Sequence, residues 1–326
     1  MKFRTIVELP EYNFKISHKK KCLLTGSCFA NNIGEVLTKN KFPCIYNPTG
    51  ILYNPFSISE SIETALSRRT VTKSELFYDN GLWNHYNFHS SFSSPDAEKC
   101  LENINTAIHL TSSALISGDF LFISFGTAYC YILKDSDSIV SNCHKQNPSI
   151  FERKLLTVAE ISKKLTEISK KLLELNPKLK IIFTISPIRH WKDGAINNQI
   201  SKSSLFLAIK SVMENLSAGT AYYFPAYEIV QDELRDYRFY AEDMLHPSVT
   251  AINYLWEKFG DAFFDSETKK LNDKIAKIIK ASEHKPFNRD TKEYRDFCEK
   301  YLKLIEDIER EFPELDFSLE KTVFQE

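Results

Sequence analysis

The hydrophobic pattern of the chain alternates between short apolar runs and longer stretches in which apolar residues recur at helical spacing. The apolar runs have the length of buried strands and lie at residues 22–25, 43–46, 119–126, 180–187 and 221–224. Helical stretches lie between and after them, at residues 28–40, 57–66, 95–115, 157–176, 201–216 and around 254–259. This alternation is typical of an α/β fold. We therefore predict three layers, with helices on both faces of a parallel sheet of about five strands.

Two parts of the chain do not follow this alternation. Aromatic residues gather at about 70–95 around Asp79-Asn80-Gly81, a hairpin turn signal, and we interpret them as the packed core of an insertion rather than a sugar-binding platform. A second hairpin is predicted at 129–141. From about residue 265 the chain is rich in Lys and Glu and helical in periodicity. We expect an α/β domain over residues 1–264 and an α-helical extension over residues 265–326.

Composition and charge narrow the classes of partner. The 326 residues are 43% hydrophobic and 26% charged, and the formal net charge is -1, so the chain lacks the positive field of nucleic-acid-binding proteins. No apolar run reaches membrane-spanning length, so we expect no membrane partner and a cytoplasmic location. The 7 cysteines include no C-x-x-C pair, which argues against a disulfide framework or a zinc site. We expect a small-molecule substrate, no metal and no cofactor.

Ser27 stands at the transition from the first predicted strand to the first predicted helix. In a parallel sheet this junction projects a hydroxyl at the carboxyl-terminal edge, beside the backbone N–H groups of a helix amino terminus. Such a position favours a nucleophile, and it equally suits a serine that only caps the helix. Cys28 offers a thiol in the same turn as an alternative nucleophile, or packs there as a small buried side chain.

A second candidate group lies more than 200 residues later, just before the last predicted helix of the α/β domain. Asp243 precedes His246 by three residues, a spacing that lets a carboxylate hold the imidazole Nδ1 and leaves Nε2 free as a general base. A D-x-x-H tetrapeptide is common, and alone it indicates a polar loop before a capped helix. The order of the two groups, a Gly-Ser turn after the first strand and D-x-x-H before the last helix, favours a catalytic pair.

The run Gly26-Ser27-Cys28-Phe29-Ala30 resembles the signature of the GSCFA family, which looks like a branch of the SGNH/GDSL hydrolase superfamily. The similarity extends through about Phe259. It implies a flavodoxin-like, SGNH-type fold and a serine esterase that acts through an acyl-enzyme. By this resemblance Ser27 is the nucleophile, His246 the general base and Asp243 the residue that orients the imidazole.

The resemblance also implies an oxyanion hole, in which SGNH enzymes use the nucleophile's N–H, a glycine N–H after the second strand and an asparagine side chain after the third. Gly50 matches the second of these. The third departs from the pattern, because Gly126-Thr127-Ala128 stands where the asparagine is expected. Thr127 or Asn54 is then the candidate donor. A single donor of this kind contributes roughly 3 kcal/mol to transition-state stabilisation.

Other loop residues fall where the predicted topology brings chain segments to the same sheet edge. Arg189 and His190 directly follow a predicted strand, and His144 lies in the loop after the second hairpin. Substrate binding and a purely structural role are both open for them. The histidines have no metal-ligand spacing.

These observations predict a serine esterase that acts on O-acyl esters, acetyl esters among them, with a carbohydrate as one class of substrate. An O-acyltransferase would use the same residues. A catalytically weak module that binds a carbohydrate or an acylated metabolite is the rival from another class, supported by the missing asparagine. A thiol enzyme acting through Cys28 is a third alternative.

Overall fold

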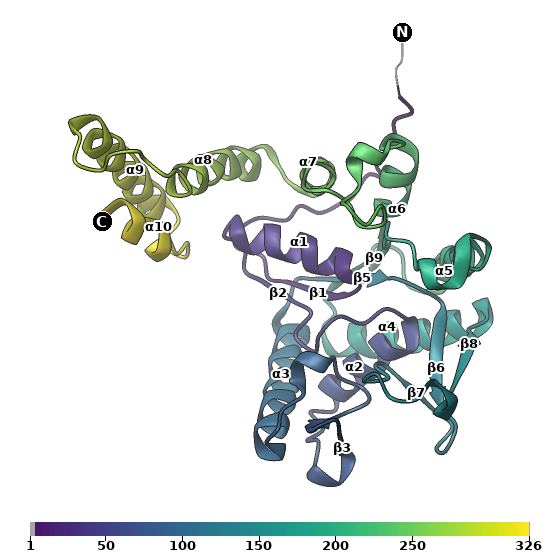
Figure 1. The fold of residues 1–326 in the computed structure, drawn as a ribbon. Coiled ribbons are helices and arrows are strands. Elements are labelled where there is room, and N and C mark those ends of the chain that lie inside the picture. Colours follow the sequence, from purple (N-terminus) through teal and green to yellow (C-terminus); the bar gives the residue numbers. More distant parts are fainter. Residues whose placement is uncertain (1–3, 326) are drawn as a thin grey trace.

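The computed structural model describes residues 4–325 and contains a central sheet of five parallel strands (Figure 1). The strands are β1 (Cys22–Gly26), β2 (Cys44–Tyr46), β5 (Phe120–Phe125), β9 (Lys180–Ile185) and β10 (Ala221–Phe224). They are arranged in the order β2-β1-β5-β9-β10, which is the flavodoxin-like order with β1 next to the topological switch point. The predicted strands and fold class are confirmed.

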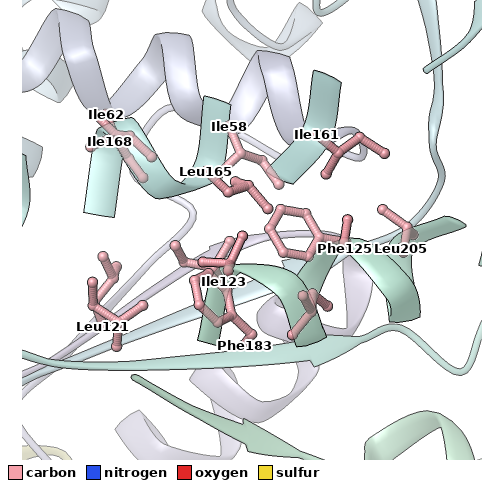
Figure 2. Close-up of a cluster of buried hydrophobic side chains, with 14 of the residues drawn as sticks. Ile58, Ile62, Leu121, Ile123, Phe125, Ile161, Leu165, Ile168, Phe183 and Leu205 are labelled. Atoms are coloured by element: carbon pink, nitrogen blue, oxygen red, sulfur yellow. The ribbon is translucent and has the colours of Figure 1, made fainter. Parts of the chain in front are cut away.

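Helices cover both faces of this sheet. One face packs against α1 (Cys28–Lys39) and α7 (Val249–Phe263), and the other against α2 (Pro55–Leu66), α4 (Val158–Leu175) and α5 (Gly194–Asn215). Side chains alternate along β5: Leu121, Ile123 and Phe125 enter the second core, whereas Phe120 and Phe122 enter the first. Figure 2 shows the second core, in which these side chains meet apolar residues of α2 and α4. Strands buried on both faces explain the nearly continuous apolar runs of the sequence.

Two small antiparallel sheets lie outside the main sheet. The insertion forms the predicted hairpin β3 (Phe77–Asp79) and β4 (Leu82–Asn84), and its neighbour in the chain is α3 (Ala97–Ser117). The second hairpin is also confirmed, as β6 (Tyr129–Leu133) and β7 (Ser138–Val140). A third strand, β8 (Phe151–Leu155), pairs with β6 and was not predicted, because its polar middle residues are exposed and give no apolar run.

The main differences between predicted and observed elements lie at helix starts. α2 begins at Pro55 rather than at residue 57, because Asn54 caps it by accepting a hydrogen bond from the Ser57 N–H at 2.9 Å. α5 begins at Gly194, earlier than the predicted residue 201, and a short helix, α6 (Ala226–Glu228), follows β10. Within residues 4–325, none of the helices combines the length and apolar character needed to cross a membrane.

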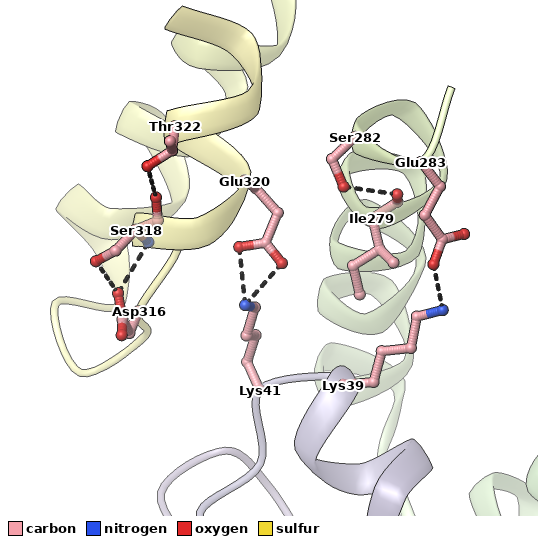
Figure 3. A network of polar contacts seen from close by, with 9 residues as sticks. All are labelled: Lys39, Lys41, Ile279, Ser282, Glu283, Asp316, Ser318, Glu320 and Thr322. Carbon is pink, nitrogen blue, oxygen red and sulfur yellow. Dashed lines mark hydrogen bonds and ion pairs between the residues drawn. The ribbon is translucent and has the colours of Figure 1, made fainter. Parts of the chain in front are cut away.

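The carboxyl-terminal helices have a hydrophobic cluster of their own. They are α8 (Ser266–Ser282), α9 (Lys292–Glu311) and α10 (Ser318–Gln325), with Ile305 and Ile308 among the buried residues. Figure 3 shows two ion pairs that join them to the end of α1: Lys39 with Glu283 at 2.6 Å, and Lys41 with Glu320 at 2.8 Å. The second pair is largely shielded from solvent.

Gly26 closes β1 with a backbone that only glycine adopts readily, at φ +123°. It lies opposite Ser124 in the parallel ladder, and a Cβ added at this position would overlap the Ser124 carbonyl oxygen. We expect Gly26→Ala to lower the free energy of unfolding by roughly 3 kcal/mol or more, measured by urea denaturation.

Gly81→Ala is the matched control for this substitution. Gly81 has φ +81°, and an added Cβ would meet no atom within 4 Å, so we expect it to lower the unfolding free energy by about 1 kcal/mol from backbone strain alone. Equal losses at the two positions would show that the contact with Ser124 contributes nothing to the cost.

Candidate active site

Ser27 lies at the carboxyl end of β1 and caps α1. Its Oγ accepts a hydrogen bond from the Phe29 N–H at 3.3 Å, and the residue is only 1% exposed. The buried strand β1 ends just before Ser27 and places it at the carboxyl-terminal edge of the sheet. The helix α1 begins directly after it, at Cys28. The two readings of Ser27 therefore coexist, because a capping serine here also lies at the positive end of the helix dipole.

Ser124 of β5 holds Ser27 in place through two contacts. The two hydroxyl oxygens are 2.7 Å apart, and the Ser27 N–H donates to the Ser124 carbonyl at 2.9 Å. Gly26 is held in turn by Asn47, whose Oδ1 accepts from the Gly26 N–H at 2.9 Å. The turn that presents Ser27 is therefore fixed on both sides.

Asp243 and His246 form a pair in the loop before α7. The imidazole Nδ1 lies 2.5 Å from Asp243 Oδ2, while Oδ1 accepts from the backbone N–H of His246 at 2.9 Å and of Leu245 at 3.0 Å. The backbone and side-chain hydrogen bonds from His246 lower the pKa of Asp243 to about 2, so it is a carboxylate across the neutral range. This arrangement leaves Nε2 of His246 unobstructed by Asp243.

A cavity of about 150 Å³, here called the inner cavity, brings Ser27 and His246 together. Its lining consists of Ser27, Cys28, Tyr53, Ser186, Ile188, Arg189, His190 and His246. Among the described residues no hydrogen bond joins Ser27 to His246, and the Ser27 hydroxyl is paired with Ser124 instead. Catalytic hydrogen bonds are often formed only when substrate is bound, so the shared cavity is the relevant observation.

The three residues predicted as further oxyanion donors do not line this cavity, and each directs its polar groups elsewhere. The Gly50 N–H donates to the Asn47 carbonyl at 2.8 Å, and the Asn54 amide donates to Ser57 Oγ at 2.9 Å. The Thr127 N–H donates to the Tyr53 carbonyl at 3.1 Å, and its hydroxyl pairs with Ser201 at 3.0 Å. The structure gives these groups roles in holding the loops, with Asn54 as a helix cap.

The predicted loop residues fall into two groups. Arg189 and His190 line the inner cavity, whereas His144 is buried under the insertion, where its Nε2 lies 2.9 Å from the His85 carbonyl and its ring packs edge-on against Phe77. Burial lowers the pKa of His144, which suits a neutral packed ring. Within residues 4–325, no group of three or more His, Cys, Asp and Glu side chains is arranged to hold a metal ion.

Cys28 is partly exposed rather than buried under the turn. Its Sγ lies 3.5 Å from the Tyr53 hydroxyl, and it borders the inner cavity next to Ser27. Because the thiol borders the cavity, it is the alternative nucleophile to be tested.

A larger cavity of about 540 Å³, here called the outer cavity, adjoins the inner one through Arg189 and the Asp243 loop. Trp191 and Tyr237 are 53% and 73% exposed, and both line it. The remaining lining residues are Gln231, Arg235, Asp236, Tyr240, Met244 and Leu245. None of the aromatic residues of the insertion lines either cavity.

Several residues at this site have weak signals in the sequence. Ser124 is the one polar residue inside the apolar run of β5, which is a visible sign of a special role. Ser186 ends the β9 run, and Tyr53 lies in a loop rich in Asn and Pro. Lys202 carries no signal, because a lysine inside a helical stretch normally faces solvent.

Comparisons with known proteins add a family and a distant structural likeness. A model of the GSCFA family matches residues 21–259, and one described as the C-terminal domain of GSCFA domain proteins matches residues 275–326. No curated protein matches the chain. Among solved structures, an acetyl xylan esterase (Est2A) from the rumen bacterium Butyrivibrio proteoclasticus is similar at 10% sequence identity and a TM-score of 0.36. That match covers 77% of this chain and 65% of the esterase, so the chain spans less than two thirds of that protein's length.

Proposed function

The chain belongs to the GSCFA family, and we propose that it is a serine esterase that cleaves short O-acyl esters through Ser27, His246 and Asp243. The observation that carries the proposal is the inner cavity, which Ser27 and His246 line together while Asp243 holds the opposite side of the imidazole. A nucleophile, a base and a residue that orients the base are the parts that activated-serine chemistry requires.

In the proposed reaction the Ser27 oxygen attacks the ester carbonyl carbon while its proton passes to His246 Nε2. The tetrahedral intermediate collapses when His246 gives that proton to the leaving alcohol oxygen, and an acyl-serine remains. Water then attacks the acyl carbon, gives a proton to His246, and the carboxylic acid departs as Ser27 regains its proton. Asp243 stays ionised throughout and stabilises the imidazolium form.

The sizes of the two cavities support a short acyl group on a larger alcohol. A volume of about 150 Å³ beside Ser27 suits an acetyl group and its near homologues, whereas about 540 Å³ in the outer cavity is within the range of small-molecule sites. The exposed rings of Trp191 and Tyr237 offer flat apolar faces on which a sugar ring can stack. We propose an O-acylated carbohydrate as the substrate class.

Solvent access supports hydrolysis over transfer to another alcohol. The side chains of Asp243 and His246 are each 48% exposed, and the insertion does not cover either cavity. Water therefore reaches the base directly, which is what resolution of an acyl-enzyme by hydrolysis needs.

Active-site labelling and acyl-length kinetics test this proposal. We expect a fluorophosphonate to label the protein with one equivalent at Ser27, as found by peptide mass analysis, and p-nitrophenyl acetate to be hydrolysed with a kcat/KM at least about tenfold above that of the octanoate, because longer chains exceed the inner cavity. Absence of labelling in folded protein would favour the binding module instead. Absence of fluorophosphonate labelling at Ser27, together with loss of turnover in Cys28→Ala, would favour the thiol enzyme.

A further inference from the structure

The ring of His190 fills the space beyond the end of β5. Its Nε2 would lie 2.8 Å from a Cβ placed on Gly126, and the ring packs edge-on against Tyr53 with centroids 5.1 Å apart. The His190 backbone N–H donates to Asn198 Oδ1 at 2.9 Å, which fixes the loop after β9. The ring is therefore held next to the carboxyl end of β5, on the border of the inner cavity.

The electrostatic surroundings keep this ring neutral. Burial, followed by the nearby Lys202, lowers the pKa of His190 to about 4. The other charges that act on it are Asp193, which is paired with Arg153, and His246. A neutral imidazole carries one N–H donor, and within the described residues no hydrogen bond involves a ring nitrogen of His190.

Lys202 lies behind the site and is completely buried. Its Nζ donates to the carbonyl oxygens of Gly126 and Ser186, each at 2.7 Å, and so ties the end of β5 to the end of β9. Burial, followed by Arg189, lowers its pKa to about 7. The amine fixes the two strand ends, including Gly126, against which the His190 ring lies, and its positive form disfavours protonation of that ring.

We infer that His190 donates its ring N–H to the carbonyl oxygen as that oxygen becomes an oxyanion, with Lys202 as the residue that positions it. This inference rests on the proposed esterase function. The donors that the resemblance implies are occupied: Gly50, Thr127 and Asn54 hold loops, and the Ser27 N–H is bonded to Ser124. The side chains on the cavity wall that can still donate are those of Tyr53, Ser186, Arg189 and His190. The Tyr53 hydroxyl contacts Cys28 Sγ, Ser186 Oγ accepts from the Ile188 N–H, and Arg189 donates to Gln231, whereas within residues 4–325 the ring nitrogens of His190 make no hydrogen bond.

The two histidines of the inner cavity thereby take different tasks. His246, half exposed and held by Asp243, takes and returns the proton. His190 transfers none: the carbonyl π electrons move onto oxygen during attack, the oxygen accepts the N–H hydrogen bond, and the electrons return when the alcohol leaves. Neutral donors aimed at a developing oxyanion are effective because they need no reorganisation during the reaction.

Kinetics of His190 variants test the inference. We expect His190→Phe, which keeps a ring without a donor, to lower kcat for an acetyl ester about 100-fold or more with KM changed less than about threefold. His190→Gln, which restores an N–H, is expected to recover at least about tenfold of that loss. His89→Ala, which removes a histidine from the insertion, is the matched control and keeps the wild-type rate. Affinity for methylboronic acid, whose serine adduct is tetrahedral, should fall in parallel with kcat/KM.

Two outcomes would overturn the inference while the proposed function stands. In the first, turnover depends on Ser27 but kcat of His190→Phe stays within about threefold of wild type. In the second, His190→Phe and His190→Gln lose kcat equally. Turnover that survives Ser27→Ala would instead remove the proposed function itself. A measurement on the wild type covers the case in which a variant fails to fold. In ¹⁵N-histidine-labelled protein, the His190 ring N–H resonance should move downfield when the boronate adduct forms, and an unmoved resonance counts against the assignment.

Discussion

Ser27→Ala is expected to reduce turnover of short acyl esters on the order of 10⁴-fold or more, since the acyl-enzyme cannot form without the hydroxyl. The fold should survive, because Ser27 contributes one weak capping bond to Phe29 and one hydroxyl contact to Ser124. The loss of these contacts should cost about 1 kcal/mol of unfolding free energy. Steady-state kinetics together with urea denaturation would separate loss of chemistry from loss of fold.

The variant Ser67→Ala is a suitable control, because it removes an exposed hydroxyl whose one hydrogen bond within residues 4–325 goes to the Thr64 carbonyl. Cys28→Ala addresses the neighbouring thiol and should keep turnover within about tenfold of wild type. A Ser27→Ala enzyme with full activity, or a dead Cys28→Ala enzyme, would refute the assignment of Ser27 as the nucleophile.

Asp243→Asn is expected to lower kcat by roughly 10³- to 10⁴-fold. The carboxylate accepts the Nδ1 hydrogen of His246, whereas an amide can present an N–H to Nδ1 and so favour the tautomer that carries hydrogen on Nε2. In that tautomer Nε2 cannot accept the Ser27 proton. Because hydrogen bonds hold the pKa of Asp243 at about 2, the wild-type carboxylate stays charged throughout the assay range, and protonation of Asp243 contributes nothing to the pH dependence above about pH 4.

Glu242→Gln is the matched control, since it neutralises an exposed carboxylate in the same loop. We expect it to leave kcat within about twofold of wild type, because surface charges act weakly through water. If both variants lost activity equally, the charge of the loop rather than the contact with His246 would be responsible.

The sequence was sufficient to predict the sheet, because the strands are buried on both faces and therefore read as apolar runs. Elements with one exposed face were harder to predict from the sequence. β8 has two exposed charged residues in its middle, and its pairing with β6 depends on partners far along the chain. The start of α2 was misplaced because Ser57 and Glu60 resemble a capping box, while Asn54 makes the cap in the structure.

At the site, Ser27 and the Asp243–His246 pair could be located because each lies within a short local pattern. The surroundings could not be, because they depend on which groups of distant segments remain free. Gly50 fits the expected glycine by position, yet its N–H is used within its own turn. The burial of Lys202 depends on the packing of α5 against the ends of two strands, which no local pattern records.

The ion pairs at the carboxyl end of α1 connect this helix, which packs on the main sheet, to the carboxyl-terminal helices. The side chains of Lys41 and Glu320 are only 14% and 11% exposed, so separating them would leave a poorly solvated charge without its partner. The amino-terminal end of α1 is capped by Ser27, whose hydroxyl forms a hydrogen bond with Ser124 of β5. Between these two ends α1 has 12 residues and is about 18 Å long, so the carboxyl-terminal helices contact the same helix whose other end positions the candidate nucleophile.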